Sequence, residues 1–305
     1  MTSASTASPT AAPTAAPTLQ IDPIAGALGA EVRGVHLCAL SPAEFAAIEA
    51  ALLEHLVLFF PDQDLSPDDH RAFAQRFGEA EIHPFIPKLD DDHPEIVVLE
   101  GTARADVWHT DVTFAEHPPI CSILKAVTMP ERGGDTMWTN QYRVYESLSA
   151  PMRDLLDGLT GVHWAKAFGH PEISTQHPAV RVHPGTGRRS LYVNRTFTSH
   201  FLELSPGEST ALLEYLYTFS EQPQFTCRYR WTPGTICIWD NRVTQHYAIN
   251  DYADARRIER VTIVGDVPTG SPPKWGPFDG ALSAYDLIDS MVTRSAVAID
   301  DRTTH

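Results

Sequence analysis

Residues 107–114, VWHTDVTF, place a histidine and an aspartate two positions apart, His109 and Asp111. The run is rich in Trp, Val, Thr and Phe, a composition typical of a buried β-strand. Because residues i and i+2 of a strand point to the same face, the two side chains would direct a nitrogen and an oxygen at one point. With a distant histidine added, they would form the two-histidine, one-carboxylate site of non-haem Fe(II) oxygenases, which leaves coordination positions open.

This spacing alone is a weak signal, because the chain contains 14 histidines. Two further histidines stand two positions before a glutamate, in the pairs His93/Glu95 and His170/Glu172. Both of these pairs enclose a proline, which lacks a backbone N–H and suits a loop or a strand edge. Of the three pairs, we therefore expect only His109 and Asp111 to lie in a strand.

The second half of the chain offers a third ligand and several arginines. In TICIWDNRVTQHYAINDY, residues 235–252, a buried strand leads through a polar turn to His246. In the strand-like run that follows, Arg256 and Arg260 would share one face, and Arg257 would lie on the other. Arginines on a core-facing strand are costly unless anions meet them. A surface strand with an Arg257–Glu259 ion pair is the alternative at this point.

Net charge limits the classes of partner. The 305-residue chain has a formal net charge of −16, which disfavours binding to nucleic acid or to an anionic membrane. No apolar run approaches the roughly 18 residues that would span a bilayer. Any small anion that the protein binds must therefore be held by a local group of Arg, Lys or His side chains.

Cysteine usage indicates the compartment. The four cysteines, Cys38, Cys121, Cys227 and Cys237, form no Cys-x-x-Cys motif, and no signal peptide precedes them. We interpret them as buried thiols of a protein from the reducing cytoplasm. A disulfide between Cys227 and Cys237 is the alternative.

Three helices are predicted to begin in the same way, at Ser41, Ser66 and Ser205. In each, the serine caps the helix, a proline follows, and an acidic residue three positions after the serine completes a capping box. Strand-like runs cover residues 95–100, 120–127, 190–194, 225–231, 235–240 and 260–265. Because these strands do not alternate with helices, we predict a mainly β sandwich or jelly roll with flanking helices.

The chain is predicted to form one domain. Residues 1–19 are almost entirely Ala, Ser, Thr and Pro, and we expect them to be disordered. Residues 20–305 would then form a single domain of ordinary size. Within it, residues 271–305 are a C-terminal extension of unassigned role, with a possible helix at residues 280–292.

Three motifs together resemble the taurine dioxygenase family of Fe(II)- and 2-oxoglutarate-dependent oxygenases. They are WHTDVTF, GGDTMW at residues 133–138, and WDNRVTQHYAINDY followed by RRIERVTIVGD. They occur in the family's order, and the likeness covers about residues 21–267. The resemblance implies a double-stranded β-helix, the cupin-like jelly roll, with flanking helices. It also implies Fe(II) held by His109, Asp111 and His246, with 2-oxoglutarate and O2 as cosubstrates.

The resemblance further implies a 2-oxoglutarate site. Thr136 would donate a hydrogen bond to the distal carboxylate, and an arginine of the RRIER run would form a bidentate ion pair with it. The family places two arginines four positions apart here, which Arg256 and Arg260 match, whereas the distance from His246 favours Arg257. We expect Arg256, because a loop can lose one residue more easily than a strand can rotate its side chains.

For the substrate, the resemblance implies that His83, in EIHPF, and Arg260 bind an anionic group, with Phe197 against the organic part. A loop histidine and a core phenylalanine are the plainer interpretations of His83 and Phe197. Anions that suit this pair are a sulfonate, a sulfate ester or a carboxylate. No residue specifies the amino group of taurine, so taurine itself is not implied.

The predicted reaction is hydroxylation of a C–H bond of a small anionic organic substrate, with succinate and CO2 as co-products. An alkyl sulfonate or a sulfate ester is favoured, and hydroxylation could lead to C–S or C–O cleavage. A carboxylate or a biosynthetic intermediate, hydroxylated or desaturated, is the alternative within the family. A metal-dependent hydrolase using zinc and a non-catalytic binding jelly roll are the alternatives of other classes. The family resemblance also implies a homodimer or homotetramer.

Overall fold

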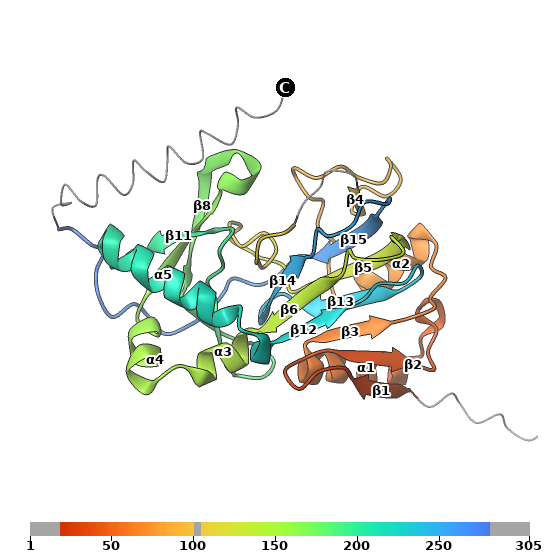
Figure 1. The fold of residues 1–305 in the computed structure, drawn as a ribbon, viewed down its shortest axis with the longest axis horizontal. Helices are drawn as coiled ribbons and strands as arrows, with labels where there is room; N and C mark the ends of the chain where they lie inside the picture. Colours follow the sequence, from red (N-terminus) through yellow and green to blue (C-terminus); the bar gives the residue numbers. More distant parts are fainter. Residues whose placement is uncertain (1–18, 101–104, 281–305) are drawn as a thin grey trace, which may run out of the picture.

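A seven-stranded sheet forms the centre of the protein. The computed structural model describes residues 19–100 and 105–280 (Figure 1). Across the main sheet the strands run in the order β1 (Gln20–Pro23), β2 (Ala30–Arg33), β3 (Val57–Phe60), β13 (Ile236–Asp240), β5 (Cys121–Thr128), β15 (Arg257–Ile263) and β4 (Val97–Glu100). Neighbouring strands are antiparallel except β2 and β3.

A second, smaller sheet packs against one face of the main sheet. It consists of β12 (Thr226–Tyr229), β6 (Thr136–Asn140) and β14 (Thr244–Ala248). Trp138 of β6 is fully buried between the two sheets, with its ring 5.3 Å from Phe59 of β3 and 5.9 Å from Trp239 of β13. The chain passes directly from β13 in one sheet to β14 in the other, which is the connection that a jelly roll requires. The predicted jelly roll is confirmed.

Alternation along the central strands separates two cores. In β13, Ile236 and Ile238 belong to the cluster that includes α1 and α2, whereas Cys237 and Trp239 belong to the cluster between the sheets. This division follows from the two-residue period of a strand. Because both faces are covered, residues 236–239 of the strand are all apolar rather than alternately apolar and polar.

The predicted helices are α1 (Pro42–His55), α2 (Pro67–Gln75) and α5 (Pro206–Ser220), and all three are confirmed. Each begins with the expected capping box, formed by Ser41, Ser66 and Ser205. Two short helices that lack such a box, α3 (Gln141–Ser147) and α4 (Ala150–Leu156), were not predicted. Their amino ends are capped by the side chains of Asn140 and Ser149.

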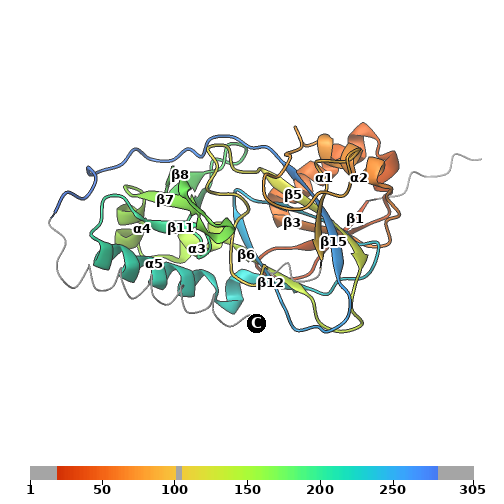
Figure 2. The same cartoon turned by 90° about the horizontal axis from the view of Figure 1, so that it is seen from above.

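A second lobe lies beside the jelly roll (Figure 2). It contains a sheet of β11 (Thr198–Phe201), β7 (Thr160–Ala165) and β8 (His170–Pro178), and the pair β9 (Val180–Val182) and β10 (Arg189–Leu191). Helices α3, α4 and α5 enclose a core with strands β9, β10 and β11. The short helices η1 (Leu37–Ala39), η2 (Lys166–Phe168) and η3 (Pro223–Phe225) complete the structure.

The strand predicted for residues 107–114 is wrong. His109 alone forms an isolated antiparallel bridge, to His246, and the chain then turns from Asp111 to Phe114. Val112 has a φ of +49°, which is costly for a β-branched residue and requires support from its neighbours. The composition of residues 107–114 correctly indicated a buried segment. Hydrogen bonds to distant parts of the chain hold this segment in a turn rather than a strand.

Both ends of the chain reach beyond the described residues. The predicted disorder of residues 1–19 and the possible helix at 280–292 lie almost wholly outside them. Residues 271–280 are described, and they run along the second lobe: the backbone N–H of Lys274 donates to the Gly158 carbonyl, and that of Phe278 donates to Leu202. None of the described helices is long and apolar enough to cross a membrane.

The four cysteines are free thiols, so the alternative of a Cys227–Cys237 disulfide is wrong. Cys121, Cys227 and Cys237 are buried as expected, but Cys38 is exposed. Cys38 belongs to the short helix η1, whose buried residue is its neighbour Leu37.

Stability should depend on pH through His70 of α2. This fully buried ring donates from Nε2 to the carbonyl of Ile123 (3.1 Å), and burial lowers its pKa to about 4. In the unfolded chain His70 binds a proton below about pH 6.5, whereas in the folded chain it does so only below about pH 4. The free energy of unfolding therefore falls over this window as the pH drops. The full difference corresponds to roughly 3 kcal/mol.

We expect the His70→Gln variant to lose less unfolding free energy than the wild type between pH 7 and pH 4.5. Urea unfolding at several pH values measures this. A difference between the two proteins that stays constant over the window would contradict the assignment.

Candidate metal centre and active site

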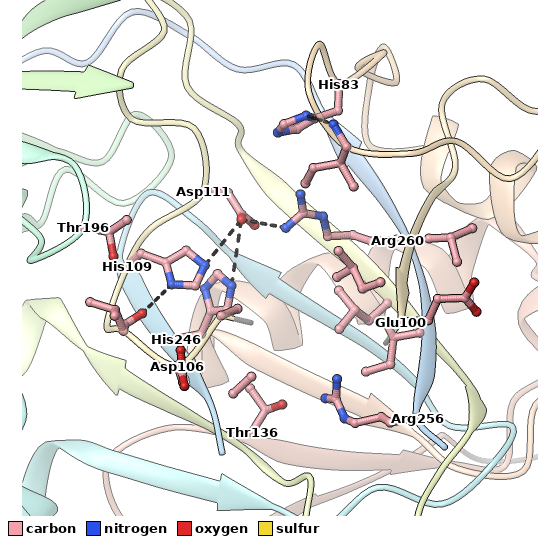
Figure 3. Close-up of a pocket in the computed structure, with 18 of the residues that line it drawn as sticks. His83, Glu100, Asp106, His109, Asp111, Thr136, Thr196, His246, Arg256 and Arg260 are labelled. Atoms are coloured by element: carbon pink, nitrogen blue, oxygen red, sulfur yellow. Dashed lines mark hydrogen bonds and ion pairs between the residues drawn. The ribbon is translucent and has the colours of Figure 1, made fainter. Parts of the chain in front are cut away.

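A cavity of about 730 Å³ opens beside the central sheets, and the predicted metal ligands line it (Figure 3). Its wall combines the segments around His83 and His109 with β15, β6 and the short helix η2. Every residue that the sequence assigned to iron, 2-oxoglutarate or substrate lines this one cavity: His83, His109, Asp111, Thr136, Phe197, His246, Arg256, Arg257 and Arg260.

The three predicted metal ligands converge. One ligand atom each from His109, Asp111 and His246 can be chosen so that all lie within 4.8 Å of one another. Asp111 Oδ1 is 3.9 Å from His109 Nε2 and 3.8 Å from His246 Nε2. The two histidines are fixed to each other by a pair of backbone hydrogen bonds, of 3.1 Å and 2.8 Å. The bridge thus brings residues 137 positions apart in the sequence to one point.

The protonation states suit a divalent metal. The His109 Nδ1–H donates to the carbonyl of Val107 (2.7 Å), which leaves the lone pair of Nε2 directed at the centre. Burial lowers the pKa of both His109 and His246, so both rings are neutral. Burial opposes ionisation of Asp111, but the positive charge of Arg260, with the two neighbouring histidines and the hydrogen bond from Ser122, holds its pKa well below its usual range. Two neutral imidazoles and one carboxylate fit Fe(II).

The two oxygens of Asp111 have different partners. Ser122 Oγ–H donates to Oδ2 (2.8 Å), and Arg260 Nη1 donates to Oδ1 (2.7 Å). Oδ1 is also the oxygen that faces the two imidazoles. His246 Nδ1 is buried and has no hydrogen-bond partner among the described residues. Ser122 was not predicted, since nothing in the sequence of a buried strand distinguishes one serine from another.

The turn that carries Asp111 is supported through Thr113. The hydroxyl of Thr113 accepts a hydrogen bond from Asn194 Nδ2 (3.1 Å) and also bonds to Nδ1 of His163 (2.9 Å). Its backbone carbonyl accepts from Nε2 of His177 (3.0 Å). All four side chains are buried. Their bonds offset the strained backbone of Val112 and hold the turn in place.

At one end of the cavity Thr136 and Arg256 lie close together (Figure 3). Thr136 Oγ1 accepts from Trp231 Nε1–H (2.9 Å), so the hydroxyl proton remains free to be donated into the cavity. Arg256 Nε donates to the carbonyl of Gly134 (3.1 Å), which leaves its two terminal nitrogens for a carboxylate. Gly134 has a φ of +71°, and a Cβ there would lie 3.2 Å from the Arg256 side chain.

Arg257 differs from Arg256 in its partners. Its Nη2 donates to Glu259 (3.0 Å) and its Nη1 lies 3.6 Å from Glu100, so its charge is already met by two carboxylates. Strand β15 begins at Arg257, with an irregular register between Arg257 and Ile258. Arg256 therefore stands one residue before the strand rather than on its face, yet it lies on the side of Thr136.

At the other end of the cavity lie His83 and Arg260 (Figure 3). His83 Nδ1 accepts from the backbone N–H groups of Phe85 (3.1 Å) and Ile86 (3.2 Å), so the ring proton is on Nε2. Nε2 is buried and has no partner among the described residues, and the same holds for Arg260 Nε. Burial and the nearby charge of Arg260 lower the pKa of His83 to about 4.

Phe197 both packs in a core and lines the cavity, so the two interpretations of it are compatible. It contacts Phe114 and Phe168, with ring centroids 5.3 Å and 6.1 Å away. Phe168 in turn stacks on Phe85 at 5.3 Å. Phe85 and Phe168 also line the cavity. Neither residue was predicted to line the site, although Phe85 stands two residues after His83 in the EIHPF motif.

A jelly roll with a buried His-Asp-His centre and arginines in the same cavity defines the non-haem iron oxygenase class. Comparison with known families agrees: residues 20–262 match the family described as "Taurine catabolism dioxygenase TauD, TfdA family". The chain belongs to this family, and it is a dioxygenase that uses Fe(II), 2-oxoglutarate (alpha-ketoglutarate) and O2.

Relatives of known name support the assignment. The chain is 39% identical to the alpha-ketoglutarate-dependent sulfate ester dioxygenase of Pseudomonas putida, over 87% of this chain and 93% of the relative. It is 38% identical to an alkylsulfatase of Acinetobacter baylyi, over 83% and 87% of the two chains. A taurine dioxygenase structure from Burkholderia xenovorans matches with a TM-score of 0.78 and 44% identity, covering 87% of this chain and 96% of that one.

Arg256 and Arg257 offer a matched pair of variants. We expect Arg256→Ala to raise the KM for 2-oxoglutarate about 10- to 100-fold, because it removes a charged bidentate contact. Arg257→Ala should change this KM less than about threefold, because Arg257 already pairs with Glu259 and Glu100. Steady-state succinate formation at varied 2-oxoglutarate measures both. The reverse order of effects would assign the cosubstrate to Arg257.

Proposed function

We propose that this dioxygenase hydroxylates a C–H bond of a small organic sulfate ester or alkyl sulfonate. The observation that carries the proposal is the buried Nε2–H of His83, which has no partner among the described residues and lies on the same side of the cavity as Arg260. A buried donor without a partner is rare in proteins and indicates a ligand. Arg260 Nε is a second buried donor without a partner among the described residues, and two such donors suit a sulfuryl group, which offers several oxygens.

The geometry gives the anion a defined place relative to the metal ligands. Arg260 donates from Nη1 to Asp111, so an anion bound by its remaining nitrogens lies next to the metal centre. Figure 3 shows the His-Asp-His group between His83 on one side and Thr136 with Arg256 on the other, and Arg260 lies beside Asp111. We therefore assign the side of His83 to the substrate and the side of Thr136 and Arg256 to the distal carboxylate of 2-oxoglutarate.

The remaining wall of the cavity favours an apolar organic group. Most of its lining beyond the two charged ends is aromatic or aliphatic: Phe85, Ile86, Leu89, Val98, Leu99, Val107, Phe168 and Phe197. A volume of about 730 Å³ leaves room for an alkyl or aryl group well beyond two carbons. The names of the relatives from P. putida and A. baylyi point in the same direction, to sulfate esters and alkyl sulfates.

The residues of this chain have separate tasks in the reaction. His109, Asp111 and His246 would hold Fe(II), and Arg256 with Thr136 would orient 2-oxoglutarate. When bound there, Fe(II) and 2-oxoglutarate supply the oxidising chemistry, in which O2 is consumed, succinate and CO2 are released and one oxygen atom enters the substrate. His83 and Arg260 orient the substrate by its anion, and the aromatic side chains exclude water.

The site of hydroxylation determines the product. If the hydroxylated carbon also bears the ester oxygen or the sulfonate sulfur, the hydroxyl proton leaves as the C–O or C–S bond breaks. The products are then an aldehyde and a sulfate or sulfite ion. The position of the anion beside the metal ligands places this carbon nearest to the centre, and supports C–O or C–S cleavage as the outcome.

The cysteines and the net charge bear on the compartment and the binding partners of the enzyme. We propose a cytoplasmic homodimer or homotetramer whose partner is the small anionic substrate, and not a nucleic acid or a membrane. Free thiols at Cys121, Cys227 and Cys237 suit a reducing compartment. The net charge of −16 opposes binding to anionic polymers and lipids.

Substrate dependence tests the proposed function. We expect medium-chain alkyl sulfates to stimulate O2-dependent succinate formation most, alkyl sulfonates less, and taurine and carboxylates least. His83→Ala should raise the KM for the alkyl sulfate about 10-fold or more, because it removes a hydrogen bond to a charged group, with the KM for 2-oxoglutarate nearly unchanged. The exposed His36 offers the control variant His36→Ala. Preferential turnover of a carboxylate would contradict the sulfate ester assignment.

A further inference from the structure

A chain of hydrogen bonds leads from a tryptophan between the sheets to the carboxylate of Asp111. Trp239 Nε1–H donates to Asn241 Oδ1 (2.8 Å), and Asn241 Nδ2–H donates to Ser122 Oγ (2.8 Å). Ser122 Oγ–H donates to Asp111 Oδ2 (2.8 Å). None of these side chains is more than 3% exposed. Water therefore cannot replace any of the bonds.

The direction of every bond in this chain is fixed. An indole N–H can only donate, so the oxygen of the Asn241 amide must face Trp239. The amide nitrogen then faces Ser122 and donates to its oxygen. The hydroxyl proton of Ser122 is left with one acceptor, Asp111 Oδ2. A single indole thus determines, through the Asn241 amide, that the Ser122 hydroxyl donates to Asp111 Oδ2.

Strand pairing brings Trp239, Asn241 and Ser122 together. Trp239 and Ser122 are direct neighbours in the register of β13 and β5. Asn241 follows β13 by one residue, and its backbone N–H donates to the carbonyl of Ile120 (2.9 Å), just before β5. The indole of Trp239 also lies 4.8 Å from the ring of His246. It therefore contacts one metal ligand directly and another through hydrogen bonds.

The hydrogen bond to Oδ2 affects how the Asp111 carboxylate can bind a metal. Oδ2 accepts from Ser122, whereas Oδ1 accepts from Arg260 Nη1 and faces both imidazoles. A carboxylate that turned to offer both oxygens would fill a further coordination position. In this site such a position is needed for 2-oxoglutarate or O2. A fixed donor on Oδ2 keeps that position open.

We propose that Trp239, Asn241 and Ser122 are positioning residues that hold Asp111 as a one-oxygen metal ligand. This inference rests on the metal site within the proposed function, but not on the identity of the substrate. Partners of metal ligands commonly change metal affinity or activity 10- to 100-fold when they are removed. A purely structural role would affect the stability of the fold but not the affinity for Fe(II).

The test compares Ser122→Ala with Ser190→Ala. Ser190 is also fully buried, but its hydroxyl donates only to backbone carbonyls, those of Arg181 and Arg242. We expect Ser122→Ala to weaken Fe(II) binding about 10- to 100-fold in anaerobic titrations, and Ser190→Ala to leave it unchanged. The melting temperatures of the two variants should fall by similar amounts.

Asn241→Asp provides a second variant of nearly equal volume. Its carboxylate would accept from both Trp239 and Ser122, which reverses the Ser122 hydroxyl and removes the donor from Asp111. We expect a loss of Fe(II) affinity like that of Ser122→Ala, and with 2-oxoglutarate a visible band that is shifted from that of the wild type. This variant keeps the test decisive if Ser122→Ala does not fold.

Two results would overturn the inference in distinguishable ways. Fe(II) affinities within about twofold of the wild type in both Ser122→Ala and Asn241→Asp would show that the hydrogen-bond chain is structural only. A wild-type protein that binds no Fe(II) would instead overturn the metal site of the proposed function, and the positioning role with it.

Discussion

The buried negative charge of Asp111 is the constraint on which the rest of the site depends. A carboxylate that is 3% exposed carries a desolvation penalty of several kcal/mol unless the protein surrounds it with donors and positive charge. Arg260, Ser122 and the two imidazoles provide this compensation. Each comes from a different part of the chain, so the jelly roll must be complete before the charge is stable.

The same constraint organises the cavity. The guanidinium that neutralises Asp111 also has an Nε without a hydrogen-bond partner among the described residues, so one arginine can serve both the metal centre and an anion. Arg256 has no carboxylate partner among the described ion pairs, so its charge is available to 2-oxoglutarate at the end of the cavity formed with Thr136. A chain of net charge −16 can thus bind two anions, because the attraction is confined to one cavity.

The sequence was sufficient where the signal is local. The capping boxes at Ser41, Ser66 and Ser205 lie within four residues each, and they predicted three helices correctly. The resemblance supplied the ligand set, and the expected strand face supplied the preference for Arg256 over Arg257. The structure places Arg256 beside Thr136, but one residue before β15 begins rather than on its face, so the reasoning from the strand face does not hold.

The sequence was insufficient where long-range contacts decide. The run 107–114 has strand composition, but Thr113 is held by Asn194, His163 and His177, which lie 50 to 81 positions away, and the chain turns. Ser122 and Asn241 act through a contact across 119 positions. No spacing rule in the sequence can reveal such partners, because they are neighbours only in the folded chain.

An anaerobic optical titration of the metal-free protein with Fe(II), and then with 2-oxoglutarate, tests the central claim most directly. If His109, Asp111 and His246 hold the metal with positions left open, 2-oxoglutarate should bind to the iron and produce a weak visible charge-transfer band. The band should be lost in His246→Ala, with circular dichroism showing an intact fold. A wild-type protein that binds iron but gives no band with 2-oxoglutarate would contradict the account.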